Sequence, residues 1–269
     1  MTNHVSLKNN DDDEEPKGLN FSFSAFSKKA FKTAADILFP PTCIGCKRHV
    51  SHPGSLCPAC WCEIRFIEHP FCPVLGTPFA HDFGSHFLCA EAIANPPPFK
   101  RLRSAVLHKG AAQRMAVSLK FYDRTDLAPW MAQWLARAGR ELLDDCDVII
   151  PVPLYRWRFW QRRYNQSAEL ARSLAKSANK PFCVDALIRT RNTVQQTGLG
   201  SKERQRNVDG AFKVPDKGDI HIRGRRILLI DDVYTTGATV RSATRTLLRH
   251  GAQSVDVLTF SRVLPEHIQ

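Results

Sequence analysis

Two adjacent carboxylates, Asp231 and Asp232, stand between a run of aliphatic residues and a short segment rich in hydroxyl groups. The aliphatic run 227–230, bounded by polar residues, is typical of a buried strand. The segment 235–239 has the sequence Thr-Thr-Gly-Ala-Thr, and a pattern typical of a helix follows it. A loop that opens onto a helix offers free backbone N–H groups and the positive end of the helix dipole, which favour a phosphate. Adjacent carboxylates suit the vicinal hydroxyl groups of a sugar, so the pattern predicts a site for a five-carbon sugar phosphate.

The loop and the two acids have separate predicted roles. We expect the helix to begin near Thr239, and Gly237 and Ala238 to let the phosphate approach the backbone closely. The acids should lie at the carboxyl end of the strand, where open α/β sheets bind their ligands. The alternative interpretation is a buried strand that ends in a threonine-rich helix cap, with both acids merely hydrated. The predicted phosphate-binding residues are Thr235, Thr236, Gly237, Ala238 and Thr239.

Two Cys-x-x-Cys pairs predict a metal site. Cys43 and Cys46 form the first pair, and Cys57 and Cys60 follow after ten intervening residues. Zinc binds four soft ligands in a tetrahedron, and two short turns of this kind deliver them in pairs. The N-terminus carries an acidic run and no secretion signal, so we expect the nine cysteines in the reducing cytoplasm, where such pairs favour metal over disulfides. The alternative is a vestigial ribbon without metal.

A second cysteine group is incomplete. Cys72 and Cys89 remain, with His81 and His86 between them. Leu75 stands where another Cys-x-x-Cys pair would end. A site made of the two cysteines and His86 would have three ligands, or four with His81, and a histidine in such a loop is more often hydrated than bound to metal. The sequence therefore predicts one structural zinc ion, and no long internal repeat is visible.

A basic segment follows the expected strand 147–153. Arginines and aromatic residues alternate through it, and Arg156 and Arg158 come first. Guanidinium groups grip phosphate oxygens. Arginines interleaved with aromatics can equally bind single-stranded nucleic acid, through charge neutralisation and base stacking. The third interpretation is a hydrated basic loop whose aromatic residues cover the core.

The segment 189–212 is polar and basic and lies inside the expected α/β region. A long polar insertion of this kind is usually either a working lid or disordered. As a lid it would close over the site and exclude water from the reacting centre. Lys202 and Arg204 would then be its cationic contacts.

The composition combines ordinary hydrophobicity with an unusual charge. The 269 residues can form one large or two small domains, and 43% hydrophobic with 24% charged residues is typical of a globular protein. The formal net charge of +12 indicates an anionic partner, which can be a phosphate-rich ligand, a nucleic acid or a membrane surface. No apolar run is long enough to span a bilayer, so we expect no transmembrane segment.

Three parts are expected along the chain. Residues 1–38 are expected to be a disordered, acidic tail and a short amphipathic helix, which either docks on the body of the protein or lies on a membrane surface. Residues 39–95 are expected to form a zinc-ribbon-like domain, and residues 96–269 an α/β domain. In the last part strands alternate with helices, which predicts a central parallel sheet flanked by helices. Beside the strand before Asp231, the expected strands are 102–108, 147–153 and 254–260, and the expected helices 111–121, 127–143, 165–178 and 239–250.

Several motifs together resemble the ComF family of phosphoribosyltransferase-like proteins, which is associated with DNA uptake in natural transformation. Beside the cysteine ribbon and the 231–239 motif, they are Val152-Pro153-Leu154, Asn165-Gln166-Ser167 and Gln196-Thr197-Gly198-Leu199. The resemblance covers roughly residues 40 to 262. It implies a type I phosphoribosyltransferase fold behind a small four-cysteine zinc ribbon, and a site for 5-phosphoribosyl pyrophosphate (PRPP) with Mg²⁺. Residues 96–269 would be the phosphoribosyltransferase-like domain.

The resemblance also assigns roles to residues. Asp231 and Asp232 would hold the ribose hydroxyls and stabilise the positive charge that develops at the reacting carbon, which makes them the predicted catalytic residues. The residues implied to bind pyrophosphate are Arg156, Arg158, Lys202 and Arg204. An active protein of this kind would be a type I phosphoribosyltransferase, a glycosyltransferase that releases pyrophosphate.

Three functions share this fold. The first is transfer of phosphoribosyl from PRPP to an acceptor. The second is a non-catalytic competence factor that binds single-stranded DNA or a competence helicase, and the third is a sensor of a phosphoribosyl ligand. The acid pair favours a sugar phosphate, because two carboxylates repel a phosphate backbone. The net charge and the arginine–aromatic segment favour nucleic acid.

Overall fold

The computed structural model describes residues 40–155, 164–191 and 210–264, and all structural statements below concern these residues. Residues 41–264 belong to one compact unit. Its helices, including the short 3-10 helices η1 and η2, are α2 (Pro58–Glu63), α3 (Ala90–Ala94), α4 (Gly110–Phe121), η1 (Thr125–Leu127), α5 (Ala128–Ala138), α6 (Arg140–Asp145), α8 (Gln166–Ala178), η2 (Asp216–His221) and α10 (Ala238–Arg249). No helix in this part of the chain is long and apolar enough to cross a bilayer.

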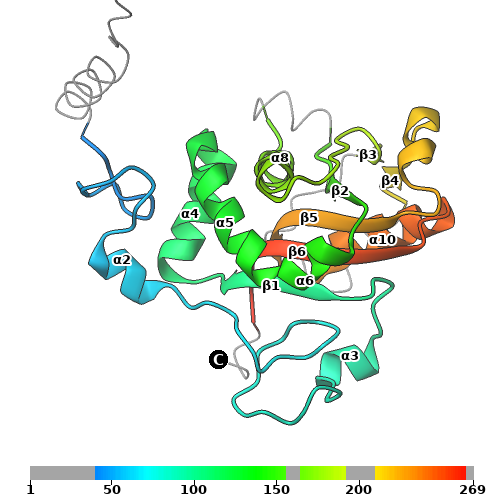
Figure 1. The fold of residues 1–269 in the computed structure, drawn as a ribbon, viewed down its shortest axis with the longest axis horizontal. Helices are drawn as coiled ribbons and strands as arrows, with labels where there is room; N and C mark the ends of the chain where they lie inside the picture. The colour runs from blue at the N-terminus through cyan, green and yellow to red at the C-terminus, as the bar shows by residue number, and fades with distance from the viewer. Residues whose placement is uncertain (1–39, 156–163, 192–209, 265–269) are drawn as a thin grey trace, which may run out of the picture. The chain divides into compact units, whose positions relative to one another are not determined.

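A parallel sheet lies at the centre of the α/β region (Figure 1). Its strands run in the order β1-β6-β5-β2, and every neighbouring pair is parallel. The predicted architecture is therefore confirmed. The strand bounds are β1 (Leu102–Leu107), β2 (Val148–Pro151), β5 (Arg226–Tyr234) and β6 (Ser254–Arg262), and a separate antiparallel pair consists of β3 (Ile188–Arg189) and β4 (Phe212–Lys213).

Each face of the sheet has its own hydrophobic cluster. Leu228 and Ile230 of β5 pack in one cluster with apolar residues of α4, α5 and α8. Ile227 and Leu229 pack in the other with the apolar side of α10. The alternation follows from the pleat of a strand, which points successive side chains to opposite faces. Both faces are thus covered, as a parallel sheet requires.

The prediction of a single helix over 127–143 is wrong in one respect, because the helix is interrupted at Gly139. Here α5 ends and α6 begins. A Cβ atom at this position would lie 2.5 Å from Cδ2 of Leu258 in β6, so the backbone passes directly over the sheet where only glycine fits.

The cysteine-rich region packs along β1. An antiparallel bridge joins Phe66 to Val106, and Ile67 N–H donates to the carbonyl of Ala105 at 3.0 Å. Further along, the N–H of Leu102 donates to the carbonyl of Val74 at 2.7 Å. The region therefore extends the hydrogen bonding of the sheet at its β1 edge.

Candidate functional site

The two acids lie in the second half of β5. Asp231 pairs with Thr259 of β6, and the strand continues past Asp232 to Tyr234. Each acid is only 9% exposed. The strand is therefore longer than the sequence predicts, and the carboxylates are held by the sheet itself instead of by the loop behind it.

Asp231 is fixed by the start of helix α8. Its Oδ1 accepts hydrogen bonds from Ser167 Oγ and from the N–H of Asp232, both at 3.0 Å. Asn165 caps the helix, because its Oδ1 accepts from Ser167 N–H at 3.1 Å while its Nδ2 donates to the carbonyl of Val152 at 3.0 Å. The motif Asn165-Gln166-Ser167 thus positions one of the acids, a role that the sequence alone does not reveal.

Burial and the neighbouring carboxylate raise the pKa of Asp231 to about 7, although the Ser167 hydroxyl and the N–H of Asp232 oppose the shift. A carboxyl group in this state gains from any ligand that brings hydroxyl donors or positive charge. The geometry around the two acids therefore fits a ligand with adjacent hydroxyl groups better than it fits an anionic group.

Asp232 has a cation beside it and one unbonded oxygen. Its Oδ1 accepts from Val233 N–H at 2.9 Å, and its Oδ2 lies 3.8 Å from Nζ of Lys120 in α4. Within the described chain Oδ2 is buried and has no hydrogen-bond donor. Lys120 is a site residue that the sequence analysis missed, because no motif marks a lysine in the last turn of an amphipathic helix.

Both acids make contacts on the same side of the sheet, although they are consecutive residues of one strand. Ser167 belongs to α8 and Lys120 to α4, and these helices pack in the same hydrophobic cluster. Groups from one face of the sheet thus contact both carboxylates, as the two hydroxyl groups of one sugar ring would.

The loop behind β5 turns sharply into α10. Thr235 is exposed, Gly237 has a φ of +72°, and Ala238 begins the helix. The first turn of α10 holds no acidic residue, so its free N–H groups and dipole favour an anion. Thr236 Oγ1 is buried and has no hydrogen-bond partner among the described residues. The loop has the expected position, and its helix begins one residue earlier than predicted.

A polar network packs behind this loop. Tyr234 is 2% exposed, and the guanidinium of Arg262 lies over its ring at 5.2 Å. The Tyr234 hydroxyl lies 3.5 Å from Glu91 of α3, which is also 4.0 Å from Arg241 of α10. The network joins the cysteine-rich region to both ends of the loop.

The residues implied to bind pyrophosphate cannot be placed. Arg156, Arg158, Lys202 and Arg204 all lie outside the described residues. Their roles stay predictions.

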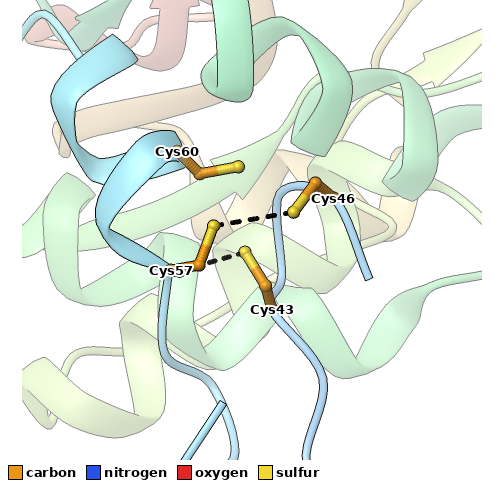
Figure 2. A group of neighbouring side chains, drawn as sticks. All are labelled: Cys43, Cys46, Cys57 and Cys60. Atoms are coloured by element: carbon orange, nitrogen blue, oxygen red, sulfur yellow. Dashed lines mark hydrogen bonds between the residues drawn. The ribbon is translucent and has the colours of Figure 1, made fainter. Parts of the chain in front are cut away.

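The four cysteines of the first ribbon converge on one point (Figure 2). Their sulfur atoms all lie within 4.8 Å of one another, and Sγ of Cys46 and Cys57 are 3.6 Å apart. A tetrahedral zinc ion with bonds of about 2.3 Å requires sulfur atoms roughly 3.8 Å apart, so the cluster fits zinc. Cys57 N–H donates to Cys43 Sγ at 3.2 Å and Arg114 to Cys60 Sγ at 3.3 Å, as outer donors to bound thiolates do.

The second cysteine group forms no such cluster. Among the described residues, only the first ribbon brings three or more potential ligands together. His81 and His86 are exposed, whereas Cys72 is fully buried and Leu75 occupies a buried position beside it.

Two family models match the chain, one over the cysteine-rich region and one over the α/β region. A family model of the double zinc ribbon domain matches residues 34–93, and one of the phosphoribosyl transferase domain matches residues 165–263. The latter range includes both acids and the loop. The four-cysteine cluster is thus the site of a zinc ribbon, suited to a structural Zn²⁺ ion.

Curated relatives match most of the chain. DNA utilization protein YhgH of Escherichia coli O157:H7 is 33% identical over 214 residues, which are 78% of this chain and 91% of that protein. Competence protein F of Haemophilus influenzae is 28% identical and covers 82% of this chain and 96% of its own length. Competence protein ComFC of Bacillus subtilis is 27% identical, with 77% and 84% covered.

Proposed function

The chain belongs to the ComF family, and from that premise we propose that it binds PRPP or a related phosphoribosyl ligand with Mg²⁺ and takes part in cytoplasmic steps of DNA uptake. The observation that carries the proposal is the pair of buried carboxylates, Asp231 and Asp232, beside a glycine turn at a helix N-terminus. Few other ligands need hydroxyl acceptors and a phosphate cradle at adjacent positions.

In this proposal each described group has one task. Asp231, held by Ser167, and Asp232 accept hydrogen bonds from the two ribose hydroxyls. The N–H groups of residues 235–239 bind the 5-phosphate. Lys120 moderates the repulsion between the two acids. Mg²⁺ would neutralise the pyrophosphate, and the acids would stabilise the positive charge that develops on the ribose if the bond to pyrophosphate breaks.

Thermal unfolding with PRPP and Mg²⁺ tests the proposal. A ligand at about 100 times its Kd stabilises the folded state by about 2.7 kcal/mol, so Tm should rise with PRPP concentration. The isosteric double variant Asp231→Asn/Asp232→Asn should lose this rise. Asp147→Asn is the matched control, because Asp147 lies just before β2 and binds Arg226 at the opposite end of β5. An unchanged Tm of the wild-type protein at millimolar PRPP would refute the proposal.

A second candidate is a non-catalytic factor that binds single-stranded DNA or a competence helicase. The net charge of +12 and the DNA-related names of the relatives favour it. DNA affinity should then fall steeply with salt. Competition separates the candidates: PRPP that displaces DNA indicates one shared site, whereas independent binding indicates two. A pyrophosphate-release assay then distinguishes a transferase from a binding protein.

A further inference from the structure

The cysteine-rich region is an internal repeat in which the second copy has the backbone of a zinc ribbon. In the first copy, Cys43 N–H donates to the carbonyl of Arg48 at 2.6 Å. In the second, Cys72 N–H donates to the carbonyl of Thr77 at 2.8 Å. The bridge Thr42–His49 corresponds to the bridge Phe71–Pro78. The left-handed Lys47, with φ +65°, likewise corresponds to Gly76, with φ +59°.

The second half of each copy also matches. Cys57 precedes α2 and Cys89 precedes α3, with nearly identical dihedral angles of −69° and 158° against −70° and 153°. Cys57 N–H donates to Cys43 Sγ, and Cys89 N–H donates to Cys72 Sγ at 3.5 Å. Cys72 and Cys89 therefore correspond to Cys43 and Cys57.

The other two ligand positions have lost their sulfur. Counting along the matched segments, Leu75 replaces Cys46 and Ala92 replaces Cys60, and both are buried in the cluster on the α10 side of the sheet. His86, which the sequence offered as a third ligand, is exposed and precedes the matched segment. Two sulfurs and two hydrocarbon side chains cannot surround a zinc ion, which needs four donors.

What remains is a pair of neighbouring thiols. Cys72 and Cys89 share a hydrogen bond that lowers the pKa of Cys72 to about 5, against the effect of burial, and raises the pKa of Cys89. The Cys89 thiol also lies 3.6 Å from Thr77 Oγ1. Cys72 is fully buried, whereas Cys89 is partly exposed. Cys89 is thus the more accessible residue of the pair, and Cys72 is the one whose thiolate form is favoured.

We propose that Cys72 and Cys89 are a redox pair that forms a reversible disulfide, a modification site that has replaced the second zinc ion. The equivalent cysteines of the first copy lie close enough to share one metal ion, so the scaffold already holds the two side chains face to face. Formation of the bond requires the sulfurs to approach to about 2.05 Å.

The oxidant is a small-molecule disulfide such as oxidised glutathione. Cys89 passes its proton to Cys72 and attacks one sulfur of glutathione disulfide, which releases one glutathione thiolate. Cys72 then loses its proton and attacks the Cys89 sulfur, which releases the second glutathione. The protein loses two electrons and the one proton that the thiol–thiolate pair carried. Glutathione disulfide gains the two electrons, and with that proton and one from solvent it leaves as two thiols.

Peptide mapping of the full-length, zinc-loaded protein tests this. The protein is incubated in a series of oxidised-to-reduced glutathione ratios and its free thiols are trapped with N-ethylmaleimide. We expect one cross-link, between the peptides that contain Cys72 and Cys89, with the mass lowered by two hydrogens and the zinc content unchanged. Reduced glutathione should reverse it.

Two variants test whether the cross-link is specific to Cys72 and Cys89. Cys62→Ser removes an exposed thiol of the first copy and should leave the cross-link unchanged. Cys72→Ser should leave Cys89 as a mixed disulfide with glutathione, because the second attack is lost. The wild-type map is decisive even where Cys72→Ser does not accumulate. Free Cys72 and Cys89 in excess oxidised glutathione, a cross-link to the first ribbon with loss of zinc, or a second zinc per chain would each overturn the proposal.

Discussion

The turn between β5 and α10 should depend on glycine at position 237 for two separate reasons. Its φ of +72° is left-handed, which costs a residue with a Cβ atom about 1–2 kcal/mol. A Cβ atom there would also lie 2.6 Å from the Tyr234 hydroxyl and 2.8 Å from its ring. Tyr234 cannot move aside freely, because Arg262 covers its ring and Glu91 lies at its hydroxyl.

Gly237→Ala should therefore destabilise the protein by about 2–5 kcal/mol, of which ~1–3 kcal/mol comes from overpacking against Tyr234. Gly224→Ala is the matched control, because Gly224 has a φ of +68° and a Cβ atom there would meet nothing within 4 Å. This control should lose only about 1–2 kcal/mol.

Urea unfolding of both variants measures the cost of a left-handed backbone and the cost of the collision with Tyr234. The difference in unfolding free energy between them isolates the collision with Tyr234, and it should be about 1–3 kcal/mol, or roughly 2–12 °C in Tm for a protein of this size. Gly237→Ala should also lose the response to PRPP, while Gly224→Ala keeps it. Equal losses of stability in the two variants would show that the Tyr234 side chain moves aside, and that its ring does not fix the position of the loop.

Three further predictions concern single groups. Burial raises the pKa of Asp231 to about 7 in the folded protein, above the unfolded value of about 3.9. The free energy of unfolding of the wild-type protein should therefore fall as pH rises from about 4 to 7, and urea unfolding at several pH values should show a flatter decline for Asp231→Asn. Cys43→Ser should lose about one zinc per chain by metal analysis, whereas Cys62→Ser, exposed and outside the cluster, should keep it. Arg262→Lys should lower the unfolding free energy by about 1.5–3 kcal/mol through loss of a buried charged hydrogen bond, whereas the exposed Arg137→Lys should change it little.

Two neighbouring strands of the sheet are predictable from the sequence because β2 and the first half of β5 contain continuous aliphatic runs. Residues 227–230 have no polar member, and both faces of a parallel sheet are covered by helices. The break at Gly139 is not predictable in the same way. It follows from the close passage of the backbone over Leu258, a contact between residues far apart in the sequence.

The candidate site likewise combines residues that the sequence predicts with residues that only the fold reveals. The motif predicts Asp231 and Asp232 because their order along the chain carries the information. Ser167 and Lys120 reach the acids from two helices, so only the packing of α8 and α4 on one face brings them there. The internal repeat was missed for a chemical reason: two of four cysteines in the second copy are replaced, and the match survives only in backbone hydrogen bonds.

The apolar residue at one ligand position of the second ribbon lies close to the turn between β5 and α10. Leu75, which stands in a ligand position, packs in the same cluster as Tyr234, and its carbonyl accepts a buried hydrogen bond from Arg262. The cysteines of the first ribbon belong to the cluster on the other face of the sheet, so each copy shares a core with one face. The second ribbon thereby supports Tyr234 and Arg262, which pack behind Gly237, through apolar contacts and this hydrogen bond.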